Sequence, residues 1–209
     1  MARTKVKADG ILRTSSDQTW RTPALLRERV RTYYAGVEWL DPAAPPDNVM
    51  GATRFYCGPR PSRVPTQGPL FGEPTTEEAN RLDGLTRPWD LPWWLNPPFS
   101  GSKEWAAKVT QEVGARPSQS GLMLLPVNRT EEAYMQDLLA LAQRMLIVHW
   151  PGSARGRIPF ESSIDGAEVD RNPFGSWLLG FGSEPAPGRW AQAFAGLGRS
   201  FALVPLEGL

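Results

Sequence analysis

The chain has 209 residues and a formal net charge of +1 at pH 7, from 23 basic and 22 acidic side chains. Its 20 glycines and 21 prolines exceed the usual share, while hydrophobic residues still make up 41%. These values exclude a coiled coil, a collagen-like chain and a wholly disordered chain, and they indicate one loop-rich domain. The balanced charge also excludes a general electrostatic coat for nucleic acid, so contacts with DNA would need local basic patches.

Cysteine and histidine occur once each, as Cys57 and His149. The chain therefore cannot close a disulfide within itself or build a Cys/His zinc cage, and no metal is expected. No apolar run is long enough for a membrane span, and the first residues lack the apolar core of a secretory signal. We expect a flexible basic tail over 1–16, a single domain over 17–209 and a cytoplasmic location.

Helical and strand-like segments alternate along the chain. Strands are expected at Val37–Leu40, Trp93–Leu95, Gly121–Val127, Met145–Trp150, Ser176–Phe181 and Phe201–Val204, and helices at Pro23–Tyr34, 77–82, Lys103–Val113 and Thr130–Gln143. Thr22 and Thr130 are candidate helix caps. Residues 58–76 are expected to form an irregular loop and residues 151–175 a polar excursion. This alternation predicts an α/β fold with a mostly parallel sheet and no internal repeat.

Two of the predicted strands end at a polar side chain. Asp41 follows the first strand, and Asn96 follows the strand Trp93–Leu95. Ligands of open α/β sheets bind at the carboxyl ends of strands. We therefore expect Asp41 and Asn96 to face one site.

Asn96-Pro97-Pro98-Phe99 is the segment with the most chemical content. Two successive prolines hold the backbone near a φ of about −65° and remove two N–H donors. The result is a stiff turn that presents acceptors, the Asn96 amide oxygen and nearby carbonyls, with an aromatic ring next to them. Such a turn suits a planar exocyclic amine, although a rigid turn that merely closes a strand is the alternative. Asn172-Pro173-Phe174 lacks the second proline and precedes its strand, so we interpret it as an ordinary turn.

The chain resembles the phage-type, Dam-like DNA N6-adenine methyltransferases from Trp20 to about Gly182. The matching segments, in the order of the family, are Trp20-Arg21-Thr22-Pro23, Leu40-Asp41-Pro42-Ala43-Ala44, Asn48 with Arg54-Phe55-Tyr56, Asp83-Gly84-Leu85 with Trp89, Leu95-Asn96-Pro97-Pro98-Phe99-Ser100, Leu124-Leu125-Pro126 and Gly156-Arg157-Ile158-Pro159-Phe160. The resemblance implies a Rossmann-like class I methyltransferase sheet with helices on both faces. It also implies methyl transfer from S-adenosylmethionine to the N6 amine of adenine in DNA.

Residue roles follow from the same resemblance. The catalytic turn would be Asn96, Pro97, Pro98 and Phe99, where Phe replaces the Tyr that is usual in the family. The cofactor would be bound by Trp20, Thr22, Pro23, Asp41, Pro42, Ala43 and Asp83. DNA would be contacted by Lys103, Arg155 and Arg157, the two arginines lying in the 151–175 excursion. Alternatively, Asp41 and Asp83 would be turn residues, Arg157 a structural partner and Lys103 a solvated side chain. The stretch that carries the cofactor-binding residues also departs from many methyltransferases, because it has no Gly-x-Gly loop.

Other functions remain compatible with the same residues. The acceptor could be cytosine N4, RNA or a protein amide, each of which presents a planar amine. A catalytically silent DNA-binding or virion-associated relative would retain the fold alone. The expected partner is DNA rather than a membrane, in a bacterial or phage-infected cell, and the protein is expected to be a monomer or a weak dimer.

Overall fold

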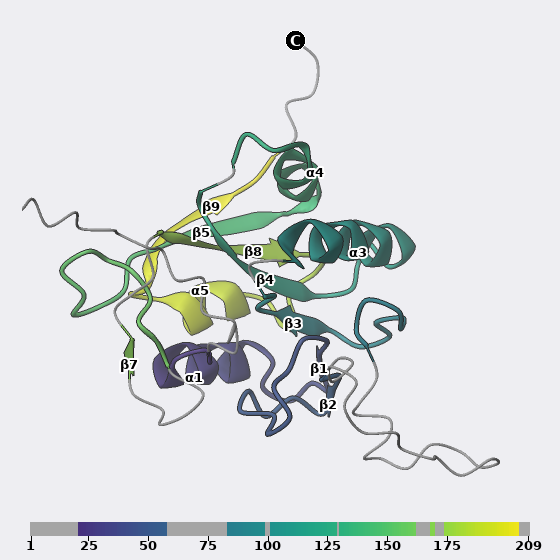
Figure 1. Cartoon of the computed structure of the whole chain (residues 1–209), viewed down its shortest axis with the longest axis horizontal. Helices are drawn as coiled ribbons and strands as arrows, with labels where there is room; N and C mark the ends of the chain where they lie inside the picture. The colour runs from purple at the N-terminus through teal and green to yellow at the C-terminus, as the bar shows by residue number, and fades with distance from the viewer. Residues whose placement is uncertain are drawn as a thin grey trace, which may run out of the picture.

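The computed structural model describes residues 21–57, 83–98, 101–128, 130–161, 168–169 and 174–204. The described strands form a seven-stranded sheet in the order β2-β1-β3-β4-β8-β5-β9, with helices on either side (Figure 1). These strands are β1 (Leu40–Asp41), β2 (Arg54–Phe55), β3 (Trp93–Leu95), β4 (Gly121–Pro126), β5 (Arg144–Val148), β8 (Ser176–Phe181) and β9 (Gly198–Ala202). The helices are α1 (Ala24–Tyr33), α3 (Ser102–Ala115), α4 (Ala133–Leu141) and α5 (Arg189–Phe194). A separate antiparallel pair joins β6 (Phe160–Glu161) to β7 (Glu168–Val169).

The sheet is mixed, so the prediction of a mostly parallel sheet is wrong. β1 runs parallel to β2 and β3, and β3 runs parallel to β4. β8 is antiparallel to both β4 and β5, and β9 is antiparallel to β5. Antiparallel neighbours need no crossover helix between them. In the described part of the chain between β5 and β8 lies the short pair β6–β7, and β8 returns between β4 and β5.

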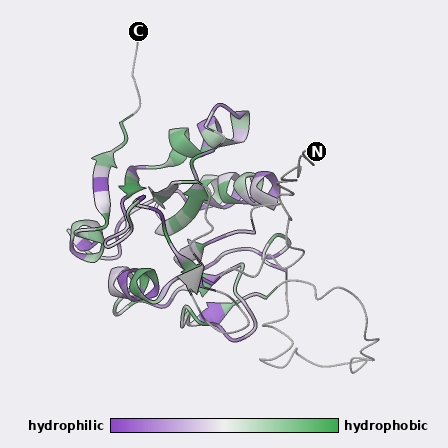
Figure 2. Ribbon diagram, turned by 60° about the vertical axis from the view of Figure 1, so that its left-hand side comes forward, coloured by the Kyte–Doolittle hydropathy of each residue, from purple (hydrophilic) through white to green (hydrophobic). Residues whose placement is uncertain are grey.

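Large side chains fill the core on both faces of the sheet. Trp94 of β3 packs with α1 and α5 on one face, whereas Trp93 and Leu95 pack with α3 and α4 on the other. This alternation follows from the two-residue period of a strand. Figure 2 shows the same pattern as largely apolar strands in the interior and helices that alternate between apolar and polar residues. The α/β architecture is therefore a sheet with a packed helical layer on each face.

Some elements have the bounds that the sequence predicts, and others have different bounds or were not predicted. The structure matches the predicted bounds of β3 and β8, and it extends the third predicted helix slightly to form α3. The short elements β2, β6, β7 and α5 were not predicted, because two residues or one and a half turns carry no readable periodicity. Residues 1–16, 58–76 and 77–82 lie outside the described residues.

Neither threonine expected to cap a helix does so. α4 begins at Ala133 with Glu132 in the N-cap position, and no side chain caps it. Pro23 precedes α1, and the side chain of Thr22 makes no cap hydrogen bond there. None of the described helices combines the length and apolar character that crossing a lipid bilayer requires.

Candidate functional site

The site lies at the carboxyl ends of β1 and β3, which are neighbours in the sheet. From β1 the chain goes to β2 on one side and later to β3 on the other. Such a reversal is the topological switch point at which α/β sheets bind ligands. Leu40 pairs with Trp93, so Asp41 and Asn96 emerge at the same edge of the sheet. The two polar strand ends singled out in the sequence therefore lie on adjacent strands.

Asn96 is oriented by a hydrogen bond from another part of the chain. Its Nδ2 donates to Oγ1 of Thr22 at 3.2 Å, and Thr22 is buried. Among the described residues no donor is bonded to Oδ1 of Asn96, which leaves this oxygen as an acceptor. Pro97 is buried and Pro98 exposed, so the turn is anchored on one side and open on the other. Phe99 lies outside the described residues.

Glu161, which the sequence did not single out, holds the segment that carries Thr22. Its Oε1 accepts from the backbone N of Ala24 at 2.8 Å, and its Oε2 accepts from Arg27 at 2.6 Å. Arg21 also pairs with Glu161 in an antiparallel bridge. Glu161 thus takes up an unpaired N–H at the start of α1, the role expected of Thr22. The signal available in the sequence was its position directly after the Gly156–Phe160 segment.

Asp41 is a buried carboxyl group at the switch point, only 3% exposed. Its Oδ1 accepts from the backbone N of Ala43 at 3.1 Å. Burial raises the pKa of Asp41 to about 7, and the hydrogen bond from Ala43 opposes that rise. A nearby cation would favour the carboxylate form, so Asp41 is a group whose charge depends on what lies beside it. Pro42 is buried and Ala43 half-buried. Trp20 lies outside the described residues.

The turn at Asp83 packs directly on the end of β1. The carboxylate of Asp83 accepts from the backbone N of Leu85 at 2.9 Å, so it acts as a local turn residue. A Cβ on Gly84 would lie 2.0 Å from the carbonyl oxygen of Pro42, so only glycine permits this contact. Asp83 is half-buried. Asp41 and Asp83 therefore sit on two turns that touch.

Charged side chains around the buried Glu112 join the turn at Asp83 to α3. Glu112, 4% exposed, accepts from Lys108 at 2.5 Å and from Arg116 at 2.8 Å. Its Oε2 also accepts from the backbone N of Trp89 at 3.0 Å. The indole of Trp89 in turn donates to the carbonyl of Gly84 at 2.9 Å. The network links α3 to the end of β1 through Trp89.

Gly84→Ala should test this packing. Because the new methyl group would overlap the Pro42 carbonyl, we expect the free energy of unfolding to fall by about 3 kcal/mol. Gly114→Ala is the matched control, since a Cβ there meets nothing within 4 Å. In the helix α3 that change should be neutral or stabilise by up to about 1 kcal/mol. Urea denaturation of both variants measures the difference, and a Gly84→Ala protein as stable as the wild type would contradict the contact.

The predicted DNA-contacting residues lie on α3 and in the excursion that follows β5. Lys103 is exposed in the first turn of α3, and Arg155 is exposed in the excursion. Arg157 is half-buried, and its backbone N donates to Oγ of Ser153 at 3.2 Å. The excursion folds against the end of β5, where a Cβ on Gly156 would lie 2.5 Å from Nδ1 of His149.

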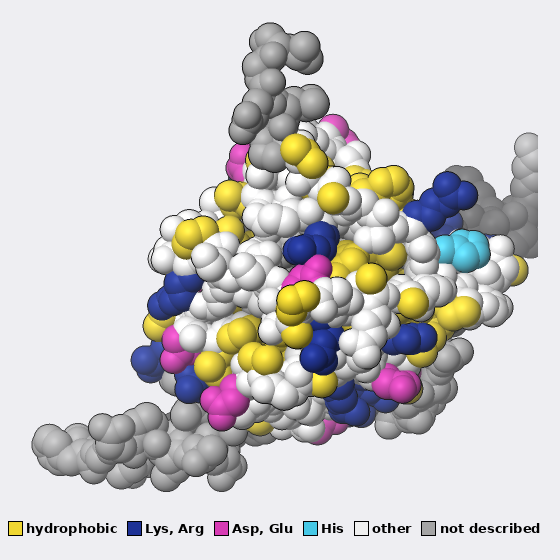
Figure 3. All heavy atoms as spheres, turned by 180° about the vertical axis from the view of Figure 1, so that it is seen from behind, with side chains coloured by type: hydrophobic (Ala, Val, Ile, Leu, Met, Phe, Trp, Pro, Cys, Tyr) yellow, Lys and Arg dark blue, Asp and Glu magenta, His cyan; other side chains and the backbone are white. Residues whose placement is uncertain are grey.

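The surface carries no strong charge separation on the face seen in Figure 3. Basic and acidic side chains are interspersed with apolar ones there, and the single histidine, in cyan, stands on the surface. In the described ranges, no group of three or more His, Cys, Asp or Glu side chains is placed to hold a metal ion.

Comparison of the chain with protein-family models and with curated proteins gives no match. Site geometry and motif resemblance are therefore the support for a functional assignment.

Proposed function

We propose that this protein is an S-adenosylmethionine-dependent methyltransferase that acts on the N6 amine of adenine in DNA. The observation that carries the proposal is the position of the Asn96-Pro97-Pro98 turn beside Asp41 at the switch point of the sheet. Thr22, joined to Asn96, and Gly84, packed on Pro42, bring two further segments of the resemblance to the same place. Segments far apart in sequence thus converge, as the parts of one binding site would.

The acceptor side of the reaction suits the turn at Asn96. The bond to Thr22 engages the amide nitrogen, so Oδ1 of Asn96 and the carbonyl of Pro97 would accept the two N–H hydrogens of the adenine amine. These bonds would draw the nitrogen lone pair out of conjugation with the ring and make it a nucleophile. Positioned dipoles would then supply most of the catalysis, because no charged base is needed first. Phe99 would stack on the base, which must leave the duplex or come from a single strand.

The donor side suits the buried carboxyl of Asp41. A carboxylate held out of water binds a cation more strongly than an exposed one, and the ammonium group of the cofactor is such a cation. Thr22, Pro23, Pro42, Ala43 and the turn of Asp83 would line the same pocket. When bound, S-adenosylmethionine supplies an electrophilic methyl group. The role of the chain is to hold the cofactor and the base side by side and to exclude water between them.

The direction of the strands supports a Rossmann-like class I sheet. β2, β1, β3 and β4 are parallel neighbours, and β5 shares their direction because β8 is antiparallel to both β4 and β5. Helices cover both faces (Figure 1). Five co-directional strands with two opposed ones are compatible with that fold, although half of the strand pairings are antiparallel.

Incubation of the purified chain with methyl-labelled S-adenosylmethionine and unmethylated DNA tests the proposal. Digestion to nucleosides should place the label in N6-methyladenine. Label in N4-methylcytosine, or label only in parallel incubations with RNA or protein, would assign the acceptor to another class. Absence of label, together with absence of cofactor binding by calorimetry, would favour a catalytically silent DNA-binding relative.

A further inference from the structure

The sheet ends in an edge strand, β9. Every residue of β9 is exposed, and its described strand neighbour is β5 alone (Figure 1). Phe201 is 42% exposed, as is Ile147 on the neighbouring strand, and Val204 beyond the strand is 78% exposed. An edge strand with exposed apolar side chains is a template for another strand. β9 contains no proline and a single charge, so it has few of the devices that usually block such pairing.

The backbone N–H and C=O groups of β9 point toward β5 or away from it, depending on whether the residue number is odd or even. His149 donates its N–H to the carbonyl of Leu197, and Leu203 donates to Gln143, so the odd-numbered residues of this segment bond toward β5. In an antiparallel ladder the intervening residues then point their N–H and C=O groups the other way. Gly198, Ser200 and Ala202 therefore present donors and acceptors along the open edge.

We propose that two copies of this chain associate through β9, antiparallel about a two-fold axis at Ser200. This register pairs Ser200 with itself and Gly198 with Ala202 through the outward-pointing backbone groups, and it uses the whole strand. It also sets Arg199 of each copy opposite Phe201 of the other, in the closer, non-hydrogen-bonded pairs. Each cation thus faces an aromatic ring. Moving the axis to Arg199 would instead oppose two arginines, and moving it to Phe201 would shorten the overlap.

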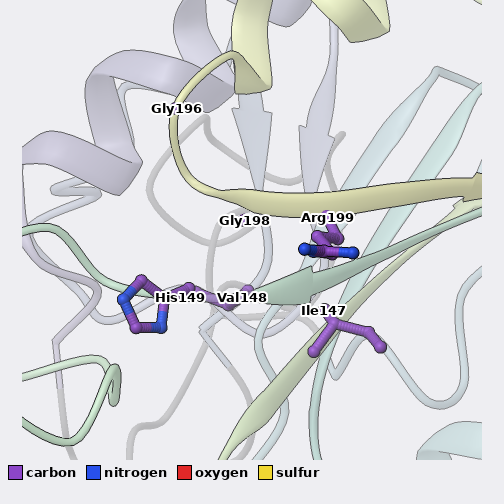
Figure 4. A pocket seen from close by; sticks show the side chains of 6 residues that line it. All are labelled: Ile147, Val148, His149, Gly196, Gly198 and Arg199. Atoms are coloured by element: carbon purple, nitrogen blue, oxygen red, sulfur yellow. The ribbon is translucent and has the colours of Figure 1, made fainter.

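The surroundings of the edge agree with this partner. A hollow of about 480 Å³ lies beside the start of β9, lined by Ile147, Val148, His149, Gly196, Gly198 and Arg199 (Figure 4). Ile147 and Arg199 lie together on neighbouring strands there, while His149 points away from them. Continued two residues past the strand, the register brings Val204 of one copy opposite Gly196 at the hollow of the other. A net charge of +1 gives the two copies little mutual repulsion.

Light scattering across a series of protein concentrations, from micromolar to submillimolar, tests the dimer. The wild-type chain should approach twice its monomer mass and dissociate on dilution. Ala202→Pro removes an outward N–H without touching a bond to β5, so it should stay monomeric, whereas the matched Ala202→Ser should behave as the wild type. A wild-type chain that is monomeric throughout, or an Ala202→Pro protein that dimerises equally well, would overturn the proposal.

A charge exchange tests the register itself and does not depend on proline. Phe201→Lys places a lysine opposite Arg199 of the second copy, so it should abolish the dimer. Adding Arg199→Glu should restore it, because each glutamate then faces a lysine across the axis. Circular dichroism checks that both variants are folded. A folded double variant that remains monomeric would contradict pairing about Ser200.

Discussion

Replacing Asn96 by alanine is expected to abolish methyl transfer, by at least about a thousandfold, while cofactor affinity changes only a few-fold. The side chain supplies the acceptor Oδ1 at the turn, and its Nδ2 is bonded to Thr22 rather than to the end of β1. Asp41, the proposed contact of the cofactor ammonium, is held separately by Ala43. Removing Asn96 should therefore affect the acceptor and spare the donor. Single-turnover assays give the rate, and calorimetry with S-adenosylhomocysteine gives the affinity.

Asn172→Ala is the matched control for this experiment. Asn172 stands in the second Asn-Pro-Phe string of the chain, which lacks the extra proline and lies outside the described residues. Its replacement should leave the rate within a few-fold of the wild type. Wild-type turnover by the Asn96→Ala protein would remove Asn96 from the mechanism. Equal losses in the two variants would show that the Asn96 turn has no special role.

The position of the site could be predicted from the sequence because it depends on where two strands end. Buried apolar runs such as Trp93–Leu95 locate a strand, and the polar residue that follows marks its end. Asp41 and Asn96 could thus be named from the sequence, and β1 and β3 are adjacent in the structure. The direction of β8 and β9 was not readable in this way. It depends on whether the intervening chain crosses the sheet, and no local pattern reports that.

Contacts between segments that are far apart in the chain were the other feature that could not be predicted from the sequence. Glu161 binds the start of α1, 137 residues from Ala24, and Gly84 meets Pro42 beside Trp89, which is bonded to Glu112 of α3. Each residue is ordinary in its local context, since a glutamate after a strand or a glycine in a turn has many uses. Only the folded chain shows that they support the segments carrying Thr22 and Asp41.

Because the pKa of Asp41 is raised, we expect rising pH to lower the stability of the folded chain and to strengthen its binding of the cofactor. Burial raises its pKa in the folded chain from 3.8 to about 7. Below about pH 4 the carboxyl is protonated in both the folded and unfolded chain, so its burial carries no ionisation penalty. Between about pH 4 and 7 the unfolded chain ionises and the folded chain does not, so stability falls as pH rises. Above pH 7 the accumulated loss is about 4 kcal/mol.

Asp41→Asn should remove this pH dependence, because an amide does not titrate and can still accept from Ala43. Relative to its difference from the wild type at pH 4, the variant should gain about 4 kcal/mol in unfolding free energy by pH 8. Denaturant unfolding over this range measures the gain. Asp90→Asn is the control, because Asp90 is an exposed carboxylate bonded to Arg54. The free energy of unfolding of this variant should stay within about 1 kcal/mol of the wild-type value across the same pH range.

The binding of S-adenosylmethionine should change in the other direction. Because the ammonium group requires the ionised form of Asp41, wild-type affinity should weaken about tenfold for each pH unit below 7, down to about pH 5.5. Asp41→Asn should bind weakly and with no such slope, so the more stable protein would be the poorer binder. Calorimetric titrations across this range decide the matter. A flat wild-type profile, or full affinity in the variant, would separate the buried carboxyl from the cofactor and leave its burial as an uncompensated cost of the turn.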